Sequence, residues 1–191
     1  MSAIAIDDEK FGVVSDTHGS YPAWLAALAV FGSGVKTILH AGDVLYHGPR
    51  NAIPGGYTPA DLAEGINDYH RNTGRVIICQ GNCDAAVDAM VLDPKIEHSV
   101  ALVWRGKKIL MMHGDNFPLL RTMALKNNVD LAISGHTHIA SITREENTIF
   151  LNPGSTTIPK GGEPESAAVV TTEGIKILTL DGKELYFEKW Q

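Results

Sequence analysis

Cysteine is scarce in this sequence: its 191 residues include two, Cys79 and Cys83. The first ends a hydrophobic run and the second lies in the turn that follows, so we expect no disulfide framework and predict a reducing, cytoplasmic location. No apolar run approaches the roughly 18 residues that span a bilayer. The segment from Met1 to Lys10 lacks a basic stretch followed by an apolar one, so a secretory signal is not predicted.

Positive charge is also in short supply. The chain has 16 Lys and Arg against 22 Asp and Glu, for a formal net charge of −6. Proteins that bind extended nucleic acid usually carry a basic surface, so we expect no such partner, and no membrane partner either. A small phosphorylated substrate stays compatible with this charge, because bound cations would reverse its sign locally.

Hydrophobic residues make up 44% of the chain, a composition typical of a globular domain, and the length fits one domain. Apolar runs and breakers in the first half predict strands and helices in alternation. The expected strands are 11–15, 37–40 and 76–80, and the expected helices are 22–31 and 58–72. A hairpin at 99–104 and 107–112, a helix at 117–127 and a strand at 131–134 follow. Short strands then predominate, at 141–144, 148–151, 167–171, 175–180 and 184–187.

A β-α-β first half followed by a mostly antiparallel second half predicts an α/β fold of the mixed α+β kind. We expect a four-layer αββα sandwich, in which two mixed β-sheets pack together and helices flank them. Residues 10–191 should form a single domain, and residues 1–9 a loosely held N-terminal extension. The longest irregular stretch is 45–58, which is rich in glycine and proline.

Five of the strand-like runs end in residues that bind metals. These motifs are Asp16-Thr17-His18, Gly42-Asp43, Gly81-Asn82, His113-Gly114 and Gly135-His136-Thr137-His138. In open α/β sheets, ligands collect beyond the carboxyl ends of the strands, so we expect the motifs to meet at one sheet edge. Two Asp, one Asn and four His, without a thiolate pair, suit two transition-metal ions better than Ca²⁺ or a structural zinc.

The order and spacing of these motifs resemble the calcineurin-like metallophosphoesterase superfamily, whose pattern is D-x-H, G-D, G-N, H and G-H-x-H. The match runs from Phe11 to at least Ser155, and the stretches 42–45, 47–51, 81–84, 152–155 and 158–162 resemble a subgroup of small bacterial phosphodiesterases. The resemblance implies two divalent ions, with Mn²⁺ favoured and Zn²⁺, Fe²⁺ or Ni²⁺ as alternatives. One ion would be held by Asp16, His18 and His138, the other by Asn82, His113 and His136, and Asp43 would bridge them.

Charge counting supports a phosphodiesterase. Two divalent ions bring four positive charges and Asp16 with Asp43 two negative ones, which leaves room for one hydroxide and one phosphodiester anion. Water that bridges two metals ionises far more readily than bulk water, whose pKa is about 15.7. We therefore predict that a small phosphodiester is hydrolysed by in-line attack of a metal-bridging hydroxide, with Asp43, Asn82 and His113 in the catalytic centre.

One position departs from the family pattern. Many relatives carry a histidine after the G-N pair, where it is thought to protonate the leaving group, whereas this chain has Cys83. A thiol with a pKa near 8.5 is a poor acid at neutral pH, so we expect slow turnover of unactivated diesters. Cys83 therefore has either a role in the pocket or a role in packing the turn.

The glycine- and proline-rich stretch 45–58 contains His47, Arg50 and Asn51, which are candidates for substrate binding because long irregular loops are often functional. Packing or a subunit contact is the alternative for these three residues. The resemblance also implies a homo-oligomer, a dimer or a tetramer.

Two other functions remain open. A phosphomonoesterase of the same fold would need extra cationic groups for the additional negative charge, and the motifs have few arginines nearby. A non-catalytic binding scaffold of this fold would have lost metal ligands, whereas every expected position is filled here.

Overall fold

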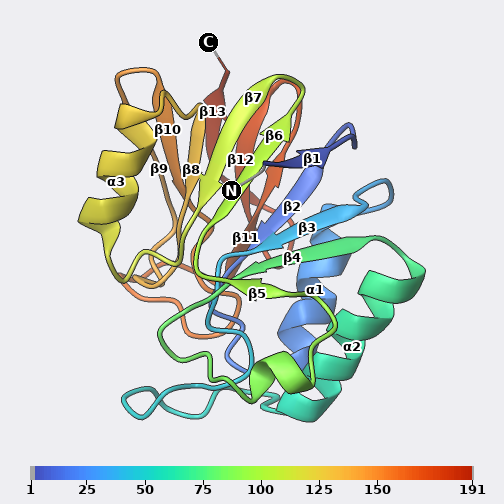
Figure 1. Ribbon diagram of the computed structural model, residues 1–191. Helices are drawn as coiled ribbons and strands as arrows, with labels where there is room; N and C mark the ends of the chain where they lie inside the picture. Colours follow the sequence, from blue (N-terminus) through green and yellow to red (C-terminus); the bar gives the residue numbers. More distant parts are fainter. Residues whose placement is uncertain (1–2, 191) are drawn as a thin grey trace.

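The computed structural model describes residues 3–190 and shows four layers (Figure 1). Two mixed sheets pack face to face. Helices α1 (Tyr21–Phe31) and α2 (Pro59–Asn72) cover the outer face of one sheet, and α3 (Phe117–Lys126) covers the outer face of the other. The predicted αββα sandwich of two mixed sheets is therefore confirmed.

The first sheet has seven strands in the order β13-β12-β11-β2-β3-β4-β5. Strands β2 to β5 run parallel, and β11 to β13 add to β2 in antiparallel fashion. Their bounds are β2 (Phe11–Val14), β3 (Thr37–His40), β4 (Arg75–Cys79), β5 (Ile96–Glu97), β11 (Ser166–Val170), β12 (Gly174–Thr179) and β13 (Glu184–Lys189).

The second sheet has six strands in the order β1-β6-β7-β8-β10-β9. It contains three parallel pairs, β1 with β6, β7 with β8, and β8 with β10, and two antiparallel ones. Its strands are β1 (Ile4–Ile6), β6 (Val100–Trp104), β7 (Lys107–Met111), β8 (Leu131–Ile133), β9 (Ser141–Glu145) and β10 (Thr148–Asn152).

Three apolar clusters hold the layers together. The largest lies between the two sheets, where the ring of Phe11 meets the edge of Trp104 with centroids 5.4 Å apart. A second cluster packs Trp24 and Ile66 of the helices against the seven-stranded sheet, and a third packs Leu120 under α3. Strands β2 and β10 are buried along their whole length, as expected for strands that are covered on both faces.

The expectation of a loosely held extension at residues 1–9 is wrong for the residues that the structure describes. Strand β1 pairs in parallel with β6, and Ile6 is buried in the core between the sheets. The Trp104 indole donates to the carbonyl of Asp8 at 2.8 Å, which fastens the segment further. The short apolar run Ile4-Ala5-Ile6 was the available signal, but three residues are too few for a periodicity argument.

Two short elements were also absent from our prediction: β5 and the 3₁₀ turn η1 (Asp88–Met90). The remaining helices and strands match their predicted ranges within a few residues. No helix in residues 3–190 is long and apolar enough to cross a membrane.

Candidate metal centre

The five motifs meet where the carboxyl ends of strands from both sheets adjoin. Asp16 and His18 follow β2, Asp43 follows β3, Asn82 follows β4, His113 follows β7, and His136 and His138 follow β8. Backbone hydrogen bonds fasten these loops to each other, from Asp16 N to Gly42 O (3.0 Å) and from Gly135 N to His113 O (2.7 Å). The structure therefore brings all seven predicted metal-binding residues together.

Much of the strained backbone of the chain lies here. Eight non-glycine residues of the described range have positive φ, and five of them are Asp16 (54°), His18 (44°), Asp43 (58°), His136 (65°) and His138 (61°). This left-handed conformation costs a side-chain-bearing residue roughly 1 kcal/mol or more. Such strain gathers at functional sites, where it aims side chains that a relaxed loop would direct elsewhere.

Two glycines permit the close approach of these loops. A Cβ at Gly81 would collide with the backbone nitrogen and side chain of Asp43, and one at Gly135 would collide with Ser15 and the Asp16 carboxylate. The glycines of the motifs Gly81-Asn82 and Gly135-His136 therefore have a steric reason.

Asp16, His18 and His138 form the first group of converging polar atoms. Asp16 Oδ1 lies 3.7 Å from His18 Nε2 and 3.3 Å from His138 Nε2, and the two nitrogens are 3.3 Å apart. All three side chains are buried. Asp16 Oδ2 accepts hydrogen bonds from Ser15 Oγ (2.6 Å) and His136 N (3.0 Å), whereas Oδ1 has no hydrogen-bond partner.

Asn82, His113 and His136 form the second group. Asn82 Oδ1 lies 3.1 Å from His113 Nε2 and 2.7 Å from His136 Nδ1. Asp43 stands between the groups, because its Oδ2 lies 3.5 Å from His113 Nε2 and 4.0 Å from His18 Nε2. Its other oxygen, Oδ1, accepts a hydrogen bond from Cys83 N at 2.7 Å. One carboxylate therefore faces both sets of nitrogens.

Backbone carbonyls fix the protonation of three of the imidazoles. His18 Nδ1 faces Tyr46 O (2.8 Å), His113 Nδ1 faces Ala41 O (2.7 Å) and His138 Nδ1 faces Ile158 O (2.7 Å). Since a carbonyl only accepts hydrogen bonds, each Nδ1 carries a proton. In the neutral form of each ring, Nε2 then carries the lone pair that a cation would take, which is the arrangement that metal-binding histidines use.

The electrostatics of the cluster favour ionised carboxylates. Burial alone would raise the pKa of the Asp16 and Asp43 carboxyls, but nearby histidines, chiefly His138 and His113 respectively, lower both. Burial would likewise lower the pKa of His113, but Asp43 and Asp16 raise it to about 9. Burial lowers the pKa of His18. A cation that binds His113 would therefore have to displace a proton.

The residues present fit divalent cations. A carboxylate oxygen that is buried without a hydrogen bond is costly unless a positive charge faces it, and Asp16 Oδ1 is such an atom. The Nε2 atoms of His18 and His138 lie beside it and 3.3 Å from each other, so one cation could bind this oxygen and both nitrogens. Carboxylate, amide oxygen and imidazole together suit Mn²⁺, Fe²⁺ or Zn²⁺.

His40 supports the cluster from behind. This buried histidine accepts a hydrogen bond from Gly42 N at 3.2 Å, and its Nε2 lies 2.9 Å from Thr17 Oγ1, which donates to Val44 O. Burial lowers the pKa of His40 to about 4, so it is neutral at pH 7. It links the loops after β2 and β3 without reaching the converging atoms.

A cavity of about 620 Å³ opens over the cluster and is lined by Asp43, Asn82, Cys83, His136 and His138. Two of the three predicted substrate residues, Arg50 and Asn51, also line it. The third predicted substrate residue, His47, does not line this cavity. Its ring lies between those of Tyr46 (4.7 Å between centroids) and Tyr57 (5.2 Å).

Four residues that line this cavity were not among the predicted site residues: Tyr46, Gly48, Pro49 and Lys160. Lys160 lies in the stretch 158–162, which resembles the bacterial subgroup. The sequence therefore marked this stretch, but it did not indicate a function for Lys160. Its segment is fastened beside the cluster, because Lys160 N donates to His138 O at 3.0 Å.

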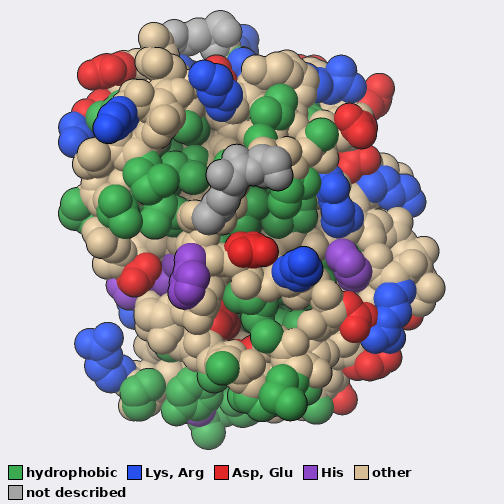
Figure 2. Space-filling model, viewed as in Figure 1, with side chains coloured by type: hydrophobic (Ala, Val, Ile, Leu, Met, Phe, Trp, Pro, Cys, Tyr) green, Lys and Arg blue, Asp and Glu red, His purple; other side chains and the backbone are tan. Residues whose placement is uncertain are grey.

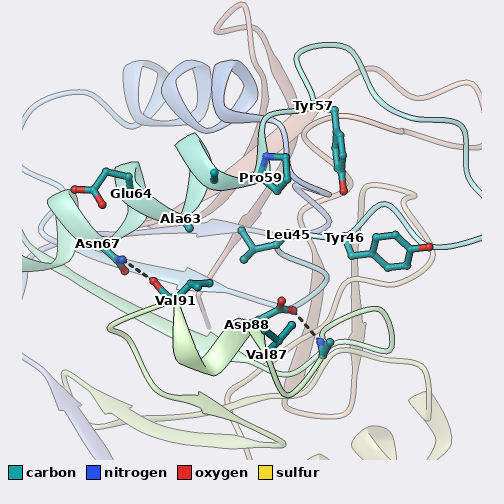
Figure 3. Close-up of a pocket in the computed structure, with 12 residues that line it drawn as sticks. Leu45, Tyr46, Tyr57, Pro59, Ala63, Glu64, Asn67, Val87, Asp88 and Val91 are labelled. Carbon is teal, nitrogen blue, oxygen red and sulfur yellow. Dashed lines mark hydrogen bonds between the residues drawn. The ribbon is translucent and has the colours of Figure 1, made fainter.

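A second cavity of about 520 Å³ borders the first at Tyr46 (Figure 3). Its lining is mostly apolar, and its charged side chains are the acidic Glu64 and Asp88. Asp88 accepts a hydrogen bond from Ala85 N at 2.8 Å. The carboxylates of Glu64 and Asp88 would repel an anion in this second cavity.

The fold and the clustered side chains define a phosphoesterase of the calcineurin-like class. Residues 10–174 match the calcineurin-like phosphoesterase superfamily domain, and the chain belongs to this family. It is similar to the phosphodiesterase YfcE of Escherichia coli K12, with 36% identity over 178 residues that cover 92% of this chain and 95% of YfcE.

Solved structures share the fold of this chain. The structure of E. coli YfcE, described as a phosphoesterase, superposes with a TM-score of 0.83 and 32% identity, and the match covers 95% of this chain and 100% of that one. Vps29 of Entamoeba histolytica, solved with zinc, superposes with a TM-score of 0.65 at 20% identity over 95% of this chain and 99% of its own. This second likeness shows a shared fold only.

Proposed function

We propose that this protein hydrolyses small phosphodiesters with two divalent metal ions. Asp16, His18 and His138 would hold one ion, Asn82, His113 and His136 the other, and Asp43 both. The observation that carries the proposal is Asp16 Oδ1, a buried carboxylate oxygen that has no hydrogen bond and faces two imidazole nitrogens. The donor set, which mixes oxygen and nitrogen, suits Mn²⁺, Fe²⁺ or Zn²⁺, and among these we favour Mn²⁺ because of the family resemblance.

When bound, the ion pair would supply positive charge for the phosphoryl oxygens and would lower the pKa of water, so that the proposed in-line hydrolysis could proceed near neutral pH. The protein's part is preorganisation. Carbonyls of Ala41, Tyr46 and Ile158 hold three imidazoles at fixed angles, so no ligand has to reorient during the reaction. The cavity leaves the cluster open toward solvent on the side where Asn82 and His136 lie, which is where a diester would enter.

A metal-replacement experiment tests this function. Metal-depleted protein is expected to leave bis(p-nitrophenyl) phosphate intact, and refilling with Mn²⁺ should restore hydrolysis with two ions bound per chain by mass spectrometry. Zn²⁺, Fe²⁺ and Ni²⁺ are refilled separately to rank the metals. Full activity without metal, or no activity with any of the four ions, would contradict the proposal.

The leaving group should control the rate. Burial, with Asp43 nearby, raises the pKa of the Cys83 thiol to about 12, so this thiol is a poorer proton donor than imidazole. We expect p-nitrophenyl diesters to be hydrolysed at least about a hundredfold faster than matched methyl diesters, the range typical of a missing general acid. Replacing Cys83 with histidine should narrow this gap by raising the rate for the methyl ester. Equal rates for both esters in the parent protein would count against this reading.

The scaffold alternative is disfavoured by the completeness of the cluster. A binding module of this fold has no need of seven converging donors or of left-handed backbone at five of them. The monoesterase alternative predicts faster hydrolysis of p-nitrophenyl phosphate than of p-nitrophenyl diesters.

We also propose that the protein acts in the cytoplasm as a homo-oligomer. Both cysteines are free, as a reducing compartment would require.

Large hydrophobic side chains are exposed at Ile53 (66%), Val87 (59%) and Met90 (82%). Hydrophobic side chains gather along the lower edge of the face in Figure 2, where Figure 1 draws the loop 45–58 and η1. An exposed hydrophobic patch of this kind favours self-association. Sedimentation of the protein as a monomer would contradict the proposed homo-oligomer.

A further inference from the structure

Two cations of the cavity over the cluster have no acidic partner. Arg50 and Lys160 line this cavity and are exposed. In the part of the chain that the structure describes, five of the 16 Lys and Arg side chains form ion pairs, which are Arg71, Arg121, Arg144, Lys176 and Lys183. Within residues 3–190, no ion pair involves Arg50 or Lys160. Their charge therefore remains available to a ligand.

The two side chains are attached to fixed parts of the site. Lys160 follows the segment whose Ile158 carbonyl accepts from His138 Nδ1, and its own backbone N–H donates to His138 O. Glu163, the acid nearest to Lys160 in the sequence, accepts instead from the hydroxyl of Tyr186 at 2.9 Å. Arg50 lies in a turn that Asn51 closes by donating to His47 O at 2.8 Å.

The charge balance identifies what these cations would bind. Two divalent ions, Asp16, Asp43, one hydroxide and one diester anion already sum to zero. Arg50 and Lys160 add two positive charges in a cavity where Asp43 is the one acidic lining residue within residues 3–190, and the chain has a net charge of −6. The cavity, at about 620 Å³, lies in the range that accommodates a whole small molecule and not merely a phosphate group.

We propose that Arg50 and Lys160 bind a second anionic group, carboxylate or phosphate, carried on an ester arm of the phosphodiester substrate. This inference rests on the proposed function, since it assumes that the phosphodiester itself lies at the metal cluster. It narrows the substrate class to diesters with at least one negative charge beyond that of the diester.

Binding of inert analogues tests the inference directly. Two phosphinates, in which carbon replaces both ester oxygens, carry either a 4-carboxybenzyl or a 4-carbamoylbenzyl arm and are otherwise identical. Calorimetry on the Mn²⁺-loaded protein should give a Kd about five- to tenfold lower for the carboxylate, the preference expected of partly exposed ion pairs with charge-assisted hydrogen bonds. Lys160→Met should reduce this preference to about twofold or less, and Arg50→Met should reduce it also.

Lys126→Met is the matched control, because Lys126 lies in the last turn of α3 and does not line the cavity. It should keep the full preference for the carboxylate. Raising the salt concentration should weaken the preference of the parent protein, since exposed charges are screened. Equal Kd values for the two phosphinates in the parent protein, or an unaltered preference in both Arg50→Met and Lys160→Met, would overturn the inference.

Turnover separates this inference from the proposed function. The p-nitrophenyl diesters with the same two arms should show the same preference in kcat/KM. A carboxylate preference in binding with no hydrolysis of either diester would refute the proposed function and leave the anion site standing. Faster hydrolysis of p-nitrophenyl phosphate than of both diesters, lost in Lys160→Met, would overturn the inference in favour of a monoesterase, because the cations would then serve the phosphoryl group itself.

Discussion

Asp43→Asn is expected to lower kcat for bis(p-nitrophenyl) phosphate by about a thousandfold or more. The Asp43 carboxylate faces both sets of imidazole nitrogens through one oxygen, with Oδ2 at 3.5 Å from His113 Nε2 and 4.0 Å from His18 Nε2. Asparagine has the same shape as aspartate but is neutral. The substitution therefore removes the negative charge from between the two cations. A loss of about 4 kcal/mol of transition-state stabilisation corresponds to this factor, since each 1.36 kcal/mol is tenfold.

The number of bound ions is the second readout for Asp43→Asn. We expect mass spectrometry to find fewer than two ions per chain, and the ion next to His113 to be the one lost more readily. Asp7→Asn, an exposed aspartate on the segment after β1, is the matched control and should retain both ions and full activity. Hydrolysis by Asp43→Asn at the parent rate would remove the basis for a bridging carboxylate.

The convergence of the metal candidates could be predicted because it follows from simple geometry. Each motif directly follows a short buried run, and the ends of neighbouring parallel strands share one edge of a sheet. The order β2-β3-β4 was implied by the β-α-β pattern of the first half. Placing His113 and His136 beside them needed the second sheet, whose packing against the first depends on side chains spread over the whole chain.

Residues in irregular segments were harder to predict. Lys160 and His47 both lie in loops, and the path of a loop depends on contacts that no periodicity reveals. His47 is a polar residue in a predicted substrate loop, but its neighbours Tyr46 and Tyr57 enclose its ring. The left-handed backbone at Asp16 and His138 had no signal either, because such φ values are imposed by the surrounding fold.

Asp84 connects the loops after β3 and β4. In the sequence it was noted only within the stretch 81–84, which resembles the bacterial subgroup. Asp84 is buried, and its Oδ2 accepts from Asp43 N (2.9 Å) and Gly81 N (2.7 Å), while its Oδ1 accepts from Val44 N (2.7 Å). One side chain thereby sets the spacing between Asp43 and Asn82. Burial raises the pKa of Asp84 even though these three N–H donors act in the opposite direction.

Asp84→Ala should therefore impair both stability and catalysis. Three buried N–H groups lose their acceptor, at about 1 kcal/mol or more each, so metal-depleted protein should unfold with a free energy lower by about 3 kcal/mol. That loss corresponds to roughly 6–12 °C in Tm for a domain of this size. Displacement of Asp43 and Asn82 should lower kcat by about a hundredfold, the cost of misplacing catalytic groups by about 1 Å.

Asp88→Ala supplies the comparison, because Asp88 is equally buried but accepts a hydrogen bond from a single backbone group, Ala85 N, away from the histidines. It should cost about 1 kcal/mol and leave kcat unaltered. Asp84→Asn should fall between the parent and Asp84→Ala, since asparagine keeps one carbonyl oxygen but turns an N–H₂ group toward backbone donors. If Asp84→Ala matched Asp88→Ala in both Tm and kcat, Asp84 would be an ordinary turn residue, and the spacing of the two metal-binding loops would have to come from the sheet alone.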